Sequence, residues 1–561
     1  MKRFLRIYCT AASTAVLLTT GVAWGAAGER TEKVDTVRLG ERIYREGILP
    51  SGVAVQAIVK GDIPVAGSTF SCAGCHQRSG LGAVEGEIVT PAVNGAKLFE
   101  PLYYGRELTA AERTGLPAHF RSPPRRPAYT HETLAVAIRD GIGATGRELS
   151  SVMPRFDLTE QDMNALIDYL GTLSAAWSPG VTDTTIRFAT VISDQVSPEA
   201  RDAMLAPLES YMAFHNDKAR VHEDRARYVA IAQEQDLSYR RLSLARWTLK
   251  GPPDTWRGQL EEYNRREPVF ALLGGMTESD WRPVHEFSEA HGIPSILPLT
   301  DLPVISDTDW YTLYFSKGLY QEGEAVARYL AKRAGTPDCG LVVQVYRDTG
   351  EGHALAAGFR NTWQTLGKRS PHARVLPPGK PVSRDLLRQI AEHDKPAAIL
   401  LWVGAEGIPA IEEAAVATTR PGTVFVSASQ MKEALFTLSE AAREITAISY
   451  PHRMPQDEAA HTRAARAWLQ SRNITPDGQR IATRMYSLLV VLSDIVPKMR
   501  RNYYRDYFLD LTGMVSGHEF PDYERLSFGP GQRYASKGCY IAELSRGPRP
   551  VLVRKSEWVD Y

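Results

Sequence analysis

The spacing of apolar residues along the chain changes near residue 180. Before that point, apolar positions recur at helical spacing in residues 38–46, 133–140 and 159–173, between stretches rich in Gly and Pro. After it, short apolar runs alternate with longer helical patterns. This second pattern predicts parallel α/β units. Because roughly 380 residues are too many for one small sheet, we expect two lobes.

The apolar runs of the second part predict strands, and the longer patterns predict helices. Strands are expected at residues 186–191, 227–232, 269–274, 295–297, 340–346, 398–403, 423–427 and 445–450. Helices are expected at residues 279–291, 318–334, 352–366, 383–393 and 407–417, among others.

The start of the chain predicts a signal peptide at residues 1–27. Basic residues open the sequence, an apolar run covers residues 11–24, and small residues follow at 25–28. This order is typical of a secretory signal, with an uncleaved amphipathic anchor as the alternative. The sequence offers no stable membrane span elsewhere. We therefore expect a periplasmic protein with a first domain at residues 34–173, a linker at 174–183 and an α/β domain at 184–561.

Composition and motif spacing exclude several classes of function. The chain has 66 Lys and Arg against 65 Asp and Glu, and this balance argues against a nucleic-acid partner. Five cysteines in 561 residues exclude a disulfide scaffold. Residues 141–146 match G-x-G-x-x-G but follow a predicted helix rather than a strand, so we expect a turn there and no dinucleotide site.

Residues 72–76 read Cys-Ala-Gly-Cys-His, the strongest chemical signal in the chain. The spacing C-x-x-C-H lets Cys72 and Cys75 form thioethers with one haem c while His76 reaches its iron. A redox dithiol or half of a zinc site are the alternatives. A redox dithiol usually opens a helix after a strand, and a zinc site needs a second pair of ligands. The sequence shows neither pattern here, so it favours one covalently attached haem.

Met153 is the expected sixth ligand of the iron. It lies in a Met-Pro pair just before the last helix of the first domain, and a His/Met ligand pair raises the haem potential. The alternative for Met153 is a core methionine, and His119 and His131 are rival ligands. Met163 lies on the apolar face of a predicted helix and is expected in the core.

Residues 34–173 resemble a class I c-type cytochrome. The resemblance depends on the N-terminal helix, residues 72–76, Asp140-Gly141, Met153-Pro154 and the closing helix. It implies an all-α domain in which Cys72 and Cys75 attach the haem and His76 and Met153 bind the iron. In detail the segment is similar to cytochrome modules that serve periplasmic dehydrogenases, which implies a periplasmic redox partner protein.

Residues 268–303 contain the clearest α/β unit of the second part. A predicted buried strand ends at Gly274-Gly275, and a helix is expected to begin near residues 277–279. Backbone N–H groups at such a helix start face the carboxyl edge of the sheet, where α/β proteins bind ligands, and they suit an anionic group. The same order of strand, glycine-containing turn and helix is expected at residues 340–359.

The order of these motifs, from Thr184 onward, resembles the type I periplasmic solute-binding proteins of the branched-chain amino-acid and amide class. The resemblance implies two lobes that close on a small molecule. It implies ligand contacts from one lobe at Thr277, Glu278, Leu299 and Thr300, and from the other at Thr349, Trp402 and Ser429.

Two positions depart from this family. Thr349 stands where an aromatic residue is common, and Ser427-Ala428-Ser429 lacks the glutamate that amino-acid binders place after that strand. A buried ammonium without a partner is costly, so we expect a ligand other than a simple amino acid.

Together these features predict a periplasmic electron carrier coupled to a solute-binding domain, and no acid–base or nucleophile set points to an enzyme. The alternatives are a ligand receptor or transport-feeding protein with the haem as redox sensor, and an enzyme that oxidises its own bound ligand. Cys339 and Cys539 form either a disulfide or two buried thiols.

Overall fold

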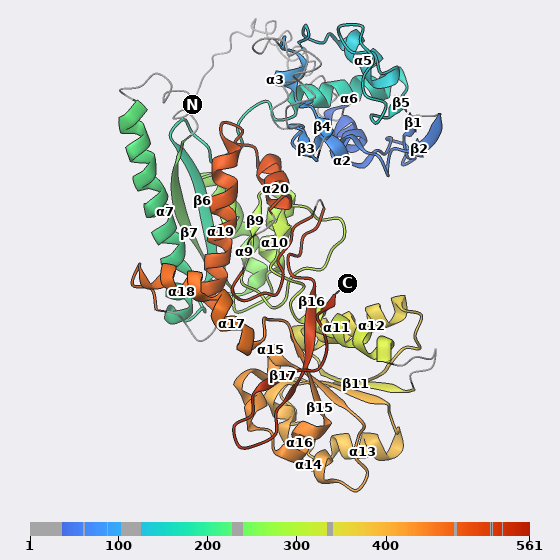
Figure 1. The fold of residues 1–561 in the computed structure, drawn as a ribbon, viewed down its shortest axis with the longest axis vertical. Helices are drawn as coiled ribbons and strands as arrows, with labels where there is room; N and C mark the ends of the chain where they lie inside the picture. The colour runs from blue at the N-terminus through green and yellow to red at the C-terminus, as the bar shows by residue number, and fades with distance from the viewer. Residues whose placement is uncertain are drawn as a thin grey trace, which may run out of the picture. The chain divides into compact units, whose positions relative to one another are not determined.

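The structure is a computed structural model, and it describes residues 36–59, 62–86, 88–102, 125–226, 239–333, 340–475, 480–515, 518, 520–529 and 531–560. The chain divides after Trp177 into two compact units, the N-terminal unit and the C-terminal unit (Figure 1). The predicted signal peptide, residues 1–27, lies outside the described residues. Within the described ranges, no helix has the length and apolarity needed to cross a bilayer.

The N-terminal unit combines helices and strands, so the prediction of an all-α domain is wrong for its described part. Its helices are residues 36–46, α2 (Cys72–His76), α3 (Gly95–Leu98), α5 (His131–Arg139) and α6 (Glu160–Thr172). Its strands are β1 (Gln56–Val59), β2 (Ile63–Ala66), β3 (Ala83–Glu85), β4 (Ile88–Thr90) and β5 (Arg155–Asp157). β1 pairs with β2 and β5, and β3 pairs with β4, all antiparallel. Strands of three or four residues are too short to produce a clear alternation in the sequence.

The first and last helices of the N-terminal unit cross at close range. A Cβ atom on Gly40 would lie 1.9 Å from the carbonyl oxygen of Ala165 on α6, so only glycine permits this approach. Tyr44 and Tyr169 pack beside the crossing with ring centroids 5.5 Å apart. Thr159 caps α6 by accepting a hydrogen bond from the Asp162 N–H at 3.2 Å, and Met163 is buried. The predicted core position of Met163 is confirmed.

The first lobe of the C-terminal unit is a parallel five-stranded sheet between helices. Its strands are β6 (Thr185–Ser193), β7 (Arg241–Leu249), β8 (Ala271–Leu273), β9 (Ser295–Ile296) and β10 (Thr312–Leu313), in the order β10-β9-β8-β6-β7. Apolar side chains pack α7 (Pro198–Ala226), α19 (Ile481–Met499) and α20 (Arg505–Gly513) on one face. They pack α9 (Trp256–Arg266) and α10 (Arg282–His291) on the other.

The second lobe has a larger sheet of the same kind. Its parallel strands are β11 (Val342–Arg347), β12 (His372–Leu376), β13 (Ala398–Trp402), β14 (Val424–Ser427) and β15 (Thr446–Tyr450). β16 (Gly538–Leu544) adds antiparallel to β15, and β17 (Leu552–Arg554) and β18 (Val559–Asp560) pair with β16. One face is covered by α11 (Leu319–Arg333) and α12 (Gly350–Thr365). The other face is covered by α13 (Leu386–His393), α14 (Ile408–Val416) and α16 (Glu440–Ile445).

Both lobes wind their five parallel strands in the order 2-1-3-4-5. In sheets of this order, ligands bind outside the carboxyl ends of the strands, near the point where the winding reverses. The chain passes between the lobes three times, after β10, after β15 and before β16 (Figure 1). We call these residues, 314–319, 450–454 and 533–538, the first, second and third crossings.

The predicted strands and helices of the second part are found close to their expected positions, with two differences. The run at residues 227–232 lies outside the described residues. β7 at residues 241–249 was not predicted, because polar residues interrupt its apolar pattern. It lies at the edge of the sheet, where a strand needs only one fully buried face.

α11 and α12 approach so closely that each places a glycine against the other. A Cβ atom on Gly358 would lie 2.0 Å from the Tyr320 carbonyl oxygen, and one on Gly323 would lie 2.2 Å from that of Leu355. We therefore expect Gly358→Ala to lower the free energy of unfolding by about 1–3 kcal/mol through overpacking. Urea unfolding of the full chain would measure this loss.

The matched control is Gly258→Ala on α9, where a Cβ atom would meet nothing within 4 Å. There the better helix propensity of alanine should leave stability unchanged or raise it by up to about 1 kcal/mol. Equal effects of the two substitutions would contradict the close approach.

Candidate functional site

A pocket in the C-terminal unit lies where residues of both lobes meet two of the crossings. Three of its residues follow β9, three belong to the first crossing, and two belong to the second crossing. Its lining residues are Pro298, Thr300, Asp301, Phe315, Ser316, Gly318, Ser429, Pro451, His452, Arg484 and Tyr523. The pocket thus lies beyond the carboxyl ends of the fourth and fifth parallel strands of the two sheets, on the edge where α/β proteins bind ligands.

Aromatic side chains form one wall of the pocket. The rings of Phe315 and Tyr523 stack with centroids 5.4 Å apart, and the ring of His452 lies 5.8 Å from that of Tyr523. Burial raises the pKa of Tyr523 to about 12, so its phenol remains a hydrogen-bond donor at neutral pH. Burial, together with the charges of Arg484 and Arg480, holds the pKa of His452 well below its usual range. His452 is therefore a neutral imidazole, able to donate at one ring nitrogen and accept at the other.

Charged side chains of both signs also line the pocket. Asp301 comes from the segment after β9, and Arg484 comes from the first turn of α19. A solute with both a hydrogen-bond donor and an anionic or acceptor group would find partners here. The expectation against a simple amino acid depended on a missing carboxylate after β14. Asp301 supplies a carboxylate from the other lobe, and the expectation of a ligand other than a simple amino acid stays a prediction.

Glu322 is a fully buried carboxyl group next to the pocket residue Ser429. It lies on α11, and the Ser449 hydroxyl donates to its Oε2 at 2.7 Å. The hydroxyls of Ser427 and Ser429 also hydrogen-bond to this carboxyl group. Burial raises the pKa of Glu322 to about 7, and the three hydroxyls only partly oppose this effect. The carboxyl group thus changes charge near neutral pH behind one wall of the pocket.

The structure brings two of the seven predicted ligand residues to the pocket, Thr300 and Ser429. α10 begins at Arg282, later than predicted, so Thr277 and Glu278 lie in the turn before it. Thr277 donates its hydroxyl proton to the Ser279 carbonyl oxygen at 2.7 Å, and the Glu278 N–H donates to the Ser193 hydroxyl at 3.3 Å.

The other three predicted residues are core or helix-capping residues of the lobes. Leu299 is buried in the core of the first lobe, and Thr349 caps α12 by accepting from the Gly352 N–H. Trp402 is fully buried in the core of the second lobe, where its indole donates to Gln344 Oε1 at 3.2 Å. Trp402 therefore has no exposed surface that a ligand could contact. Helices cover both faces of this sheet, so the side chains on either face of the strand lie in a core.

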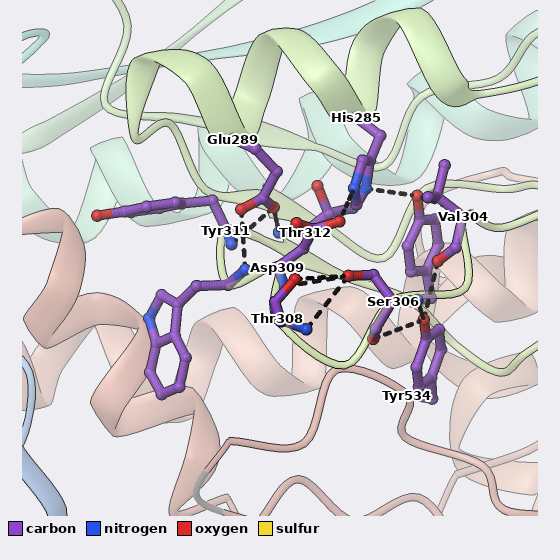
Figure 2. A network of polar contacts seen from close by, with 11 residues as sticks. His285, Glu289, Val304, Ser306, Thr308, Asp309, Tyr311, Thr312 and Tyr534 are labelled. Atoms are coloured by element: carbon purple, nitrogen blue, oxygen red, sulfur yellow. Dashed lines mark hydrogen bonds and ion pairs between the residues drawn. The ribbon is translucent and has the colours of Figure 1, made fainter. Parts of the chain in front are cut away.

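The loop after Thr300 and Asp301 is held from α10 by a partly buried polar network (Figure 2). The Glu289 carboxylate accepts the backbone N–H groups of Trp310, Tyr311 and Thr312 at 2.8–2.9 Å. His285 Nε2 lies 2.8 Å from Asp309 Oδ2. These bonds fix the loop between the pocket and β10.

The third crossing holds the same loop from the other side (Figure 2). The Tyr534 hydroxyl donates to the Val304 carbonyl oxygen at 2.8 Å and accepts from the Ser306 N–H at 3.0 Å. Arg533 donates to the Trp310 carbonyl oxygen at 2.6 Å. The segment that leads away from the pocket residues is thus fixed by helix α10 and by a crossing.

The C-x-x-C-H motif forms the single-turn helix α2 in the N-terminal unit. Ser71 caps it by accepting from the Gly74 N–H, and both thiols are free. Burial raises the pKa of Cys72 to about 12 and also raises that of Cys75. The Nδ1 atom of His76 lies 2.8 Å from the Pro91 carbonyl oxygen. Since a carbonyl can only accept, Nδ1 carries the proton and Nε2 is the nitrogen left for a metal.

Met153 is partly buried in the loop between α5 and β5. Of the two rival ligands, His131 is the exposed first residue of α5, and His119 lies outside the described residues. In the described part of the chain, no group of three or more His, Cys, Asp and Glu side chains is placed to hold a metal ion. Cys539 is buried, but Cys339 lies outside the described residues, so the choice between a disulfide and two buried thiols is not tested.

The N-terminal unit exposes an unusual amount of apolar surface. Of the 21 large apolar side chains that are exposed among the described residues, 12 lie in this smaller unit. Three of them, Val84, Ile88 and Val89, belong to the β3–β4 hairpin, where Glu85 is close enough to raise the pKa of Cys75. Apolar surface beside α2 suits a large apolar group bound there.

Comparison with a family model finds a match in the central part of the chain. Residues 250–499 match the family described as periplasmic binding protein. This stretch is similar to that family and makes up less than half of the chain. It extends from α9 in the first lobe, through most of the second lobe, to the end of α19.

A comparison with solved structures finds matches that share little sequence with this chain. One is a branched-chain amino acid ABC transporter from Thermus thermophilus with bound valine, at 14% identity and a TM-score of 0.46, covering 68% of this chain and 98% of that one. Another is a solute binding protein of an ABC transporter from R. palustris in complex with benzoate, at 13% identity and a TM-score of 0.44, covering 67% and 96%. A third, an ABC transporter substrate-binding protein from Sphaerobacter thermophilus, has 14% identity and a TM-score of 0.47, covering 67% and 99%. No curated protein matches the sequence.

Sequence reasoning named two of the eleven residues that line the pocket. Among the nine that it missed are His452, Arg484 and Tyr523. His452 follows the predicted strand at 445–450, so the rule that ligands bind after strands could have found it. Arg484 and Tyr523 lie far along the chain, and no local pattern marks them as neighbours of Thr300.

The buried carboxyl group of Glu322 predicts a pH-dependent stability. Its pKa is about 7 in the folded state against 4.5 in the unfolded chain. Between these values the folded state binds more protons, so stability falls as the pH rises, by about 2–3 kcal/mol between pH 5 and pH 8. Glu322→Gln should remove this part of the slope. Urea unfolding of both proteins at the two pH values would measure it.

The control for this measurement is Glu351→Gln, an exposed glutamate in the first turn of α12. For this variant, the dependence of the free energy of unfolding on pH should equal that of the wild type. A Glu322→Gln protein that keeps the wild-type slope would show that the carboxyl group is not the source.

Proposed function

We propose that the protein binds a small molecule in the pocket between the two lobes. The observation that supports this proposal is the composition of the pocket, because its walls come from both lobes and from two crossings. A ligand that contacts both lobes stabilises one arrangement of them over others, which is how two-lobed proteins report that a solute is bound.

The pocket chemistry narrows the solute to a small polar molecule with a flat or apolar part. Phe315 and Tyr523 offer a stacked aromatic wall, while Arg484 and Asp301 offer opposite charges. Thr300 and Ser429 add hydroxyl groups, one from each lobe. A protein of this kind delivers its solute to a membrane transporter or receptor in the periplasm, where the predicted signal peptide would send it.

Truncation of the two pocket hydroxyls should weaken solute binding. A panel of amino acids, amides and aromatic acids, screened by thermal shift on the full chain, should contain compounds that raise the unfolding temperature. For such a compound, Thr300→Ala and Ser429→Ala should each lower the affinity by about 3- to 10-fold, the effect of one hydrogen bond. Isothermal titration calorimetry would measure the change.

The control is Thr365→Ala, an exposed threonine on α12 away from the pocket. It should leave the affinity unchanged. Affinities that do not respond to either pocket substitution would show that the solute binds elsewhere.

We further propose that the N-terminal unit carries one covalently attached haem c. The supporting observation is the hydrogen bond between His76 Nδ1 and the Pro91 carbonyl oxygen, because such a bond fixes the ring and directs Nε2 to a metal. Cys72 and Cys75 would hold the group by thioethers, and Met153 would supply the second axial ligand. When bound, the haem supplies one-electron transfer, and a periplasmic redox protein would be the partner.

Removal of either cysteine should weaken haem attachment, and removal of both should abolish it. Expressed in a periplasm that matures c-type cytochromes, the wild-type protein should have the mass of the chain plus one haem. Its alkaline pyridine spectrum should be that of haem c. The Cys72→Ala and Cys75→Ala double variant should lose the haem on acid extraction, whereas Cys539→Ala should keep it. A wild-type protein with a disulfide or zinc at these two cysteines would contradict the proposal.

A further inference from the structure

Arg155 makes several hydrogen bonds to the loop that carries Met153. Arg155 begins β5, where its backbone is registered opposite Ile58 of β1. Its side chain turns back under the loop that precedes it. There Nη1 donates to the Met153 carbonyl oxygen at 2.6 Å, and Nη2 donates to the Leu149 carbonyl oxygen at 3.2 Å. Both nitrogens also lie 3.5 Å from the Ser150 carbonyl oxygen.

One guanidinium group therefore binds three carbonyl oxygens within five residues of chain. Arginine presents its five N–H donors in a rigid planar fork, so it can fix several acceptors at once. A lysine carries a single ammonium group on a flexible stem and cannot reproduce this geometry. The charge of the guanidinium also strengthens each hydrogen bond.

Gly141 makes room for this guanidinium. Its φ angle is +72°, and a Cβ atom there would lie 1.9 Å from Arg155 Nε and 2.0 Å from Cζ. Its carbonyl oxygen accepts the Leu149 N–H at 2.8 Å, which closes the base of the same loop. Gly141 before the loop and Arg155 after it thus act together to hold the loop in place.

We propose that Arg155 is a positioning residue that holds Met153 where its thioether can bind the haem iron. The inference rests on the proposed haem site and goes beyond it, since neither Arg155 nor Gly141 would touch the haem in this role. The bonds fix the backbone of residues 149–153 and leave the Met153 side chain free to act as ligand. Without them the loop gains conformational freedom, and the methionine is bound to the iron for a smaller fraction of the time.

The test compares Arg155→Lys and Arg155→Gln with the wild type in the full haem-containing chain. The readouts are the weak red absorption band that a ferric iron–thioether bond produces, the reduction potential, and the affinity of the ferric haem for added imidazole. We expect the band to weaken, the potential to fall, and the imidazole affinity to rise by about tenfold or more, because charge-assisted hydrogen bonds are lost. Gly141→Ala, which pushes on the guanidinium, should act in the same direction.

Two further variants separate positioning from general stability. Arg147→Gln changes an exposed arginine of the same loop region and should leave all three readouts at wild-type values. In a Met153→Ala background the band is absent, and Arg155→Gln should then add no further gain in imidazole affinity. A gain that persists without Met153 would overturn the proposal.

The outcomes distinguish this inference from the proposal on which it rests. A wild-type chain without covalent haem would overturn both. A haem-containing wild type without the thioether band would remove Met153 as ligand and overturn the role of Arg155, while haem attachment stands. Arg155 variants that lose thermal stability but keep the wild-type band and potential would show a purely structural role. If Arg155→Gln fails to fold, Arg155→Lys and Gly141→Ala give the same three readouts.

Discussion

The pairing of the first and third crossings is the contact on which the pocket of the C-terminal unit depends. Tyr314 donates its N–H to the Arg533 carbonyl oxygen at 2.8 Å, and the Ser536 N–H donates to the Phe315 carbonyl oxygen at 2.7 Å. The rings of Tyr314 and Tyr534 stack beside this short ladder with centroids 5.9 Å apart. These backbone hydrogen bonds fix the first crossing, whose residues Phe315 and Ser316 line the pocket. They also fix the loop after Asp301, because Tyr534 binds that loop as well.

A single charged side chain organises each of three irregular segments in this protein. Arg155 donates hydrogen bonds to carbonyl oxygens of the Met153 loop, and Glu289 accepts hydrogen bonds from three backbone N–H groups next to the start of β10. Arg505 donates to the carbonyl oxygens of Val269, Phe270, His291 and Gly292, which lie at either end of the α/β unit containing β8 and α10. Irregular backbone carries polar groups that no regular structure satisfies, and one partly buried charged side chain satisfies several of them.

The sequence predicted the architecture better than the directions of individual side chains. Apolar periodicity located β6, β11 and β13 because both faces of these strands are buried, and burial is what the pattern reports. The position of Trp402 was taken from the family resemblance. A resemblance gives the position of a residue in the chain, but it does not show which face of the strand its side chain lies on. The prediction of an all-α N-terminal unit came from its resemblance to a cytochrome, and strands of three or four residues are too short for their alternation to correct it.

Distance along the chain explains the rest of what the sequence could not reveal. Thr300 and Ser429 follow predicted strands, and both line the pocket. Arg484 and Tyr523 join them only because the chain returns to the first lobe after β15, and no local pattern encodes that return. The C-x-x-C-H motif is the opposite case, because its chemistry needs five consecutive residues and can be found without any knowledge of the fold.

The interleaved path of the chain also sets the order in which the C-terminal unit can be completed. β15 needs β16 as its neighbour, yet α19 and α20 of the first lobe are synthesised between these two strands. The second lobe therefore keeps an open sheet edge until the last helices of the first lobe exist, and neither lobe is a continuous piece of chain. Such long-range pairing is slow and leaves strand edges exposed in the meantime. The second lobe can consequently be completed only after the last helices of the first lobe have been synthesised.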